Sequence, residues 1–120
     1  GGPIGAPGPE VLRALVAADA ILVSDYGNGV TAQPTLRAAL GARVGHVPVV
    51  WDPHPRGSDP VPGATLVTPN HAEAARAVGA AARIEAADDV RATADAAAEL
   101  CGKWSARAVC VTLGARGALL

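Results

Sequence analysis

Four short runs of apolar residues alternate along this chain with segments whose apolar residues repeat at helical spacing. The runs span residues 20–24, 47–51, 65–68 and 108–112. Each run is compact and continuous, which is typical of parallel strands covered by helices on both faces. We therefore expect βαβ units with right-handed crossovers and a mostly parallel α/β sheet.

Helical spacing marks the segments between these runs. Apolar residues from Val11 to Val16 share one helical face and predict a short amphipathic helix after a Gly- and Pro-rich opening. Further helices are expected over about residues 34–40, 70–78 and 86–101. The chain has 120 residues, half of them hydrophobic, and a net charge of -1. These values describe one soluble globular domain.

Composition argues against several classes of protein. Acidic and basic residues nearly cancel and the aromatics are two Trp and one Tyr, so a nucleic-acid groove is not expected. No apolar stretch approaches the roughly 20 residues of a membrane span, so we expect no membrane partner and a cytoplasmic location. Cys101 and Cys110 lack the paired spacing of a zinc site and are expected to be reduced thiols. Walker and dinucleotide-binding glycine motifs are absent from the sequence.

Polar or glycine residues follow every apolar run. They are Asp25, Asp52, Asn70 with Glu73, and Thr112 with Gly114 and Gly117. In an open parallel sheet, ligands bind in the crevice beyond the carboxyl ends of the strands. We therefore expect a single crevice that collects these residues.

Asn70 and Glu73 support two interpretations. An Asn at a helix start with Glu three residues later is a capping-box pattern, in which each side chain binds a free backbone amide. Alternatively, Glu73 holds water on Mg²⁺ while the helix N-terminus attracts nucleotide phosphates. The two roles are compatible.

The other strand ends also leave alternatives open. Residues 112–117 fit either a glycine turn between two strands or a loop whose backbone approaches a nucleotide. Asp25 and Asp52 fit either loop capping or ligand contact. The histidines lack metal-ligand spacing and are expected to be solvated, namely His46, His54 and His71.

Three motifs in this order resemble the ribokinase-like (PfkB) carbohydrate kinases: Asp52-Pro53, Thr68-Pro69-Asn70-x-x-Glu73 and Val111-Thr112-Leu113-Gly114-x-x-Gly117. Within that family, residues 23–29 and 63–70 look most like the kinase domain of bacterial heptose 7-phosphate kinases. The resemblance implies a three-layer αβα sandwich. Residues 1–120 would form the central part of one such domain, without the N-terminal lid region and the C-terminal catalytic segment. The general-base Asp is therefore expected downstream of Leu120.

The resemblance also implies the chemistry. The enzyme would use ATP and Mg²⁺ to phosphorylate a sugar or sugar phosphate, most closely heptose 7-phosphate at its anomeric hydroxyl for ADP-heptose synthesis. Residues implied at the ATP site are Asn70, Glu73, Thr112, Gly114 and Gly117, with Glu73 as the metal residue and Asp25 and Asp52 on the sugar side. The isolated 120 residues would be inactive without the general base.

Two other functions remain open at this point. One is a related sugar kinase of the fructose phosphate or ribose type, and the other is a non-catalytic α/β module that binds a nucleotide or a sugar. Asn28 and His54 stand where heptose kinases usually or often carry Lys. The implied partner is a small-molecule sugar or sugar phosphate, and the resemblance also allows a homodimer.

Overall fold

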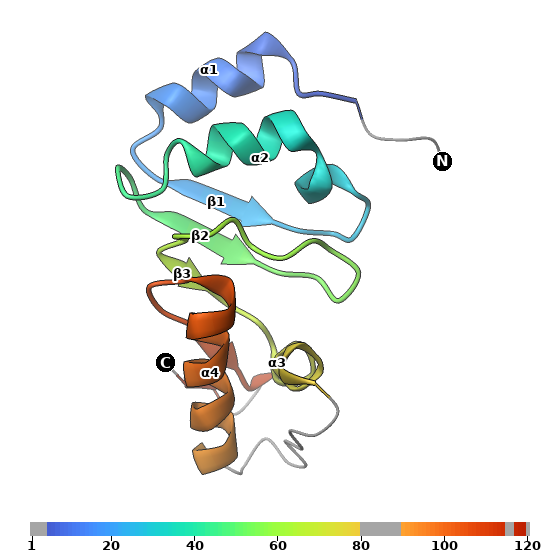
Figure 1. Ribbon diagram of the computed structural model, residues 1–120, viewed down its shortest axis with the longest axis vertical. Coiled ribbons are helices and arrows are strands. Elements are labelled where there is room, and N and C mark those ends of the chain that lie inside the picture. The colour runs from blue at the N-terminus through green and yellow to red at the C-terminus, as the bar shows by residue number, and fades with distance from the viewer. Residues whose placement is uncertain (1–4, 80–89, 115–116, 120) are drawn as a thin grey trace.

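Strands and helices alternate along the chain in the computed structural model, which describes residues 5–79, 90–114 and 117–119. Figure 1 shows their arrangement. The helices are α1 (Pro9–Ala17), the 3₁₀ turn η1 (Val30–Ala32), α2 (Pro34–Gly41), α3 (His71–Val78) and α4 (Val90–Trp104). The strands are β1 (Ile21–Ser24), β2 (Val49–Asp52), β3 (Leu66–Val67), β4 (Val111–Thr112) and β5 (Ala118–Leu119). The part of the predicted fourth helix that covers residues 86–89 lies outside the described residues.

Local sequence explains where the helices begin. Proline occupies the first turn of both α1 and α2, a position where its fixed φ fits and its missing N–H is not needed. The Gln33 side chain also caps α2 by accepting the Leu36 N–H at 2.8 Å. No helix in the described ranges is both long enough and apolar enough to cross a lipid bilayer.

β1, β2 and β3 form a parallel sheet in that order (Figure 1). Ser24 pairs with Asp52 across β1 and β2, and Trp51 pairs with Val67 across β2 and β3. The prediction of a parallel α/β sheet is confirmed. Because the strands are parallel and in register, their carboxyl ends meet at one edge of the sheet.

The fourth apolar run lies beside β3 in the predicted parallel direction, but it pairs through isolated bridges. These bridges join Val67 to Val109 and Asn70 to Thr112. Pro69 stands between the two bridged positions and has no N–H to give the ladder, although its carbonyl accepts the Thr112 N–H at 2.9 Å. The proline therefore interrupts the pairing without changing its direction.

After β4 the chain turns back on itself. β4 and β5 pair antiparallel, with Val111 opposite Leu119. Gly114 has φ +62° and Gly117 has φ +99°, values that glycine tolerates without steric strain. The antiparallel pairing and the two glycine conformations agree with the interpretation of this segment as a turn between two strands, of which residues 115 and 116 lie outside the described residues.

The hydrophobic core lies on one face of the sheet. It joins buried side chains from the strands with others from α2, α3 and α4, among them Ile21, Leu40, Val49, Trp51, Val67, Ala74 and Leu100. Leu22 points to the opposite face and is 69% exposed. Alternate side chains of β1 therefore point away from the helices that supply this core, and this face of β1 is uncovered by the described residues.

Leu100 of α4 is 0% exposed and belongs to this core. We predict that Leu100→Ala lowers the free energy of unfolding by about 2–5 kcal/mol, because it removes buried methyl groups and leaves a cavity. Urea denaturation measures the change. Val16→Ala is the control, since Val16 is 69% exposed and its loss should change stability by about 0.5 kcal/mol or less. Equal losses from the two variants would contradict this core assignment.

Candidate functional site

A crevice of about 700 Å³ extends from the face of the sheet that the described residues leave uncovered, at Leu22 and Val50, to the carboxyl ends of the strands. Its lining includes five of the residues expected there from sequence, namely Asp25, Asp52, Asn70, Glu73 and Thr112. Gly114 and Gly117 are not among the described residues that line it. The parallel sheet has thus brought together side chains that lie far apart in the sequence.

Asn70 and Glu73 form a reciprocal cap at the start of α3. The Asn70 side-chain oxygen accepts the Glu73 N–H at 2.8 Å, and Glu73 Oε1 accepts the Asn70 N–H at 2.7 Å. The capping interpretation is confirmed. The cap uses one carboxylate oxygen of Glu73, and the other makes no hydrogen bond to the described residues.

At the start of α3, the carboxylate of Glu73 lines the crevice and could bind a divalent cation there. No group of three His, Cys, Asp or Glu side chains gathers as a metal site among the residues that the structure describes. Mg²⁺ is commonly held by one or two carboxylates together with substrate phosphates and water. The free oxygen of Glu73, beside the N-terminus of α3, fits that kind of shared coordination.

Asp52 ends β2 and keeps its carboxylate exposed in the crevice. Thr68 Oγ1 donates to Asp52 Oδ1 at 3.3 Å, so the residue that follows β3 helps to orient the carboxylate. Thr68 also lines the crevice, a position that was not predicted. Its position directly before Pro69 and Asn70 is the sequence feature from which its place in the crevice could have been predicted.

Asp25 directly follows β1 and is only 7% exposed. Its Oδ1 accepts the Gly27 N–H at 2.8 Å, and its Oδ2 accepts the Thr31 hydroxyl at 2.7 Å. Loop capping by Asp25 is therefore confirmed. Contact between Asp25 and a sugar remains a prediction.

His54 was expected to be solvated, but it is half-buried and lines the crevice. Its Nδ1 accepts the Arg56 N–H at 3.1 Å. His71 is also half-buried, and its Nε2 is enclosed without a hydrogen-bond partner. Only His46 is exposed as predicted. The spacing of the histidines along the sequence could not show that the folded loop turns His54 toward the strand ends.

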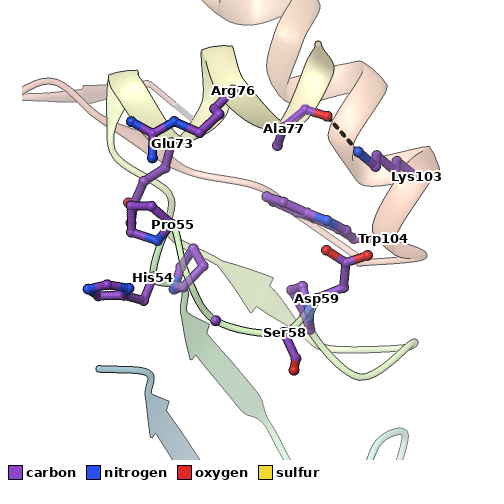
Figure 2. A pocket seen from close by; sticks show the side chains of 12 residues that line it. His54, Pro55, Ser58, Asp59, Glu73, Arg76, Ala77, Lys103 and Trp104 are labelled. Atoms are coloured by element: carbon purple, nitrogen blue, oxygen red, sulfur yellow. Dashed lines mark hydrogen bonds between the residues drawn. The ribbon is translucent and has the colours of Figure 1, made fainter. Parts of the chain in front are cut away.

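A smaller cavity of about 180 Å³ adjoins the crevice and shares Pro53, His54 and Glu73 with it. Figure 2 shows Trp104 reaching into this cavity from α4. Lys103 Nζ donates to the Ala77 carbonyl at 2.6 Å and so ties α4 to α3. The loop of residues 53–60 therefore has the crevice on one side and packed helices on the other.

Comparison with known proteins identifies the class to which this fold and crevice belong. Residues 11–120 match the model of the pfkB family carbohydrate kinases. This chain is a member of that family.

Three relatives show which proteins this chain is similar to. The chain is 50% identical over 111 residues to the "Bifunctional protein HldE" of Streptomyces coelicolor, covering 92% of this chain and 22% of the relative. It is 37% identical over 108 residues to the protein of the same name from Azorhizobium caulinodans, covering 89% of this chain and 21% of the relative. It is 43% identical over 70 residues to the "D-beta-D-heptose 7-phosphate kinase" of Bordetella bronchiseptica, covering 58% of this chain and 22% of the relative. The chain thus spans about a fifth of the length of these relatives.

The cap at α3 gives a direct test of the site's local structure. We predict that Asn70→Ala lowers the free energy of unfolding by about 0.5–2 kcal/mol, because the Glu73 N–H loses its acceptor. Asn70→Asp is the matched control, since it keeps a side-chain oxygen at the same position. Urea denaturation compares the two, and an Asn70→Ala variant as stable as the wild type would contradict the role of this cap.

Proposed function

We propose that the polypeptide containing this chain transfers the γ-phosphoryl group of ATP to a sugar phosphate, namely to the anomeric hydroxyl of heptose 7-phosphate. The proposal includes Mg²⁺ as a cofactor, a cytoplasmic location where ATP and sugar phosphates are available, and assembly as a homodimer. It also keeps the general-base Asp outside these 120 residues. The isolated chain is therefore expected to be inactive.

The observation that carries the proposal is the shared crevice in a member of a sugar kinase family. Asp52, Glu73 and Thr112 reach it from three different strand ends. Phosphoryl transfer depends mainly on positioning and on charge stabilisation, so a preformed polar edge is the expected contribution of such a segment. The heptose 7-phosphate kinase named among the relatives favours that sugar over others.

Within this proposal, the two ends of the crevice have different tasks. Asn70, Glu73 and Thr112 lie toward the nucleotide and its phosphates, with Gly114 and Gly117 shaping the backbone of the following turn. Glu73 would hold Mg²⁺ through the oxygen that the helix cap leaves free. Asp52 and Asp25 lie on the sugar side.

The test of the activity uses the full-length polypeptide. We expect ADP release that requires both ATP and heptose 7-phosphate, with lower kcat/KM for fructose 6-phosphate and for ribose. Phosphorus NMR should place the new phosphate on the anomeric oxygen. ADP release that is faster with fructose 6-phosphate or ribose would favour the related sugar kinases, and no sugar-dependent release would favour the non-catalytic module.

Glu73→Gln separates the metal role from the helix cap. Gln also completes a capping box, so the thermal midpoint should stay close to that of the wild type. Removal of the charge should raise the Mg²⁺ concentration needed for half-maximal rate and lower kcat/KM by about 10- to 100-fold, the range for residues that support metal sites. EDTA should abolish the activity of both proteins.

The control is Glu99→Gln, which removes the same charge from an exposed position on α4. It should leave both the Mg²⁺ dependence and the rate unchanged. A Glu73→Gln enzyme with wild-type Mg²⁺ dependence would remove Glu73 from the metal site.

A further inference from the structure

The carboxylate of Asp25 is buried where two loops meet. Both of its oxygens accept hydrogen bonds from the loop that follows β1, one from the Gly27 N–H and one from the Thr31 hydroxyl. Thr31 is itself only 3% exposed. Asp25 also continues the sheet, because its N–H donates to the Asp52 carbonyl at 3.0 Å. Asp25 is therefore held through its side chain by its own loop and through its backbone by the neighbouring strand.

The loop after β2 packs directly against this carboxylate. A Cβ atom on Gly57 would overlap Asp25 Oδ2, so the loop approaches as closely as a glycine allows. A second close contact lies nearby, between a glycine of the loop after β1 and a side chain of the loop after β2. There, a Cβ atom on Gly27 would overlap the His54 ring. Gly27 also has φ +76°, which disfavours any larger residue. The two loops thus interlock at two glycines, with Asp25 and His54 as the opposing side chains.

Arg37 holds the same two loops at a second point. Its Nη1 donates to the Thr31 carbonyl at 3.0 Å and to the Asp59 carbonyl at 2.9 Å. Its guanidinium lies 5.8 Å from the centroid of the Trp51 ring, within the range of a cation–π contact. Thr31 is therefore held through its hydroxyl by Asp25 and through its backbone by Arg37.

Two contacts fix the orientation of His54, namely the close approach of Gly27 to its ring and the hydrogen bond from the Arg56 N–H. Because Nδ1 accepts the Arg56 N–H, the neutral ring carries its proton on Nε2, which is then a hydrogen-bond donor. In Figure 2 the His54 ring points away from the Trp104 side of the smaller cavity. His54 lines the crevice together with Asp52 and Glu73.

We infer that Asp25 is a positioning residue, which holds the loop after β2 so that His54 donates from Nε2 to an oxygen of the phosphorylated sugar. The inference rests on the proposed function and assigns His54 to the sugar side of the crevice. Asp25 then acts through His54 and does not itself contact the substrate. Thr31, which fixes the Asp25 carboxylate, belongs to the same chain of contacts.

The test measures separate KM values for heptose 7-phosphate and for ATP in the full-length enzyme. Thr31→Val removes the hydroxyl donor to Asp25 at nearly constant volume, and we expect about a tenfold rise in KM for the sugar with KM for ATP unchanged. Thr31→Ser keeps the hydroxyl and should restore the wild-type value. Thr35→Val makes the same change at an exposed position on α2 and should alter neither KM.

A double-mutant cycle tests whether the effect passes through His54. His54→Phe should raise the sugar KM about tenfold, and adding Thr31→Val should raise it little further, because the donor that Asp25 positions is already gone. Independent, multiplicative effects would overturn the inference. So would a Thr31→Val enzyme in which thermal stability falls while both KM values stay unchanged.

Nitrogen NMR of the wild-type protein gives a second measurement that does not depend on how the Thr31 variants fold. The His54 ring signals, assigned by their loss in His54→Gln, should show the neutral form protonated at Nε2. A neutral ring protonated at Nδ1 would overturn the inference alone. A wild-type enzyme that phosphorylates no sugar would overturn the proposed function, and the inference would fall with it.

Discussion

The parallel register of β1, β2 and β3 is the constraint on which the candidate site depends. Ser24 lies opposite Asp52 and Trp51 lies opposite Val67, so successive strands end at nearly the same level. A slip of one residue would send every side chain of a strand to the opposite face. It would bury Asp52 against the core and remove its contact with Thr68. The hydrophobic face of the sheet therefore enforces the geometry of its polar edge.

Structural and chemical roles coincide at this edge. Asn70 and Glu73 stabilise the start of α3, and the same cap leaves one oxygen of Glu73 free in the crevice. Asp25 stabilises the loop after β1 with both oxygens and meets the loop after β2 at Gly57. Residues of this kind cannot be divided into those for folding and those for function. Substitutions that keep the hydrogen bonds but change the charge, or the reverse, are needed to separate the two.

Continuous apolar runs were sufficient to predict β1, β2 and the parallel direction, because such runs are typical of the strands of parallel sheets. They predicted more continuous pairing for the fourth run than the structure has. Pro69 lacks the N–H that would bond to this run, and the apolar pattern of the run itself does not show that loss. They also predicted cover on both faces, whereas Leu22 is exposed in the described part of the chain. His54 was missed for a related reason, because its position depends on how its loop packs against Gly27.

The sequence by itself determined the α/β class, the helix cap at Asn70 and the family of sugar kinases, because these depend on local spacing and on motifs read along the chain. Only the tertiary structure decided which strand-end residues share one crevice and which are already engaged by the chain. Asp25 and Asp52 looked equivalent in sequence, yet one is buried with both oxygens bonded and the other is exposed. The hydrogen bonds of Asp25 come from its own loop, but its enclosure also depends on Gly57, and the Asp52 carboxylate is oriented by Thr68. The physical reason is that the contacts with Gly57 and Thr68 join residues distant in sequence, which no local pattern encodes.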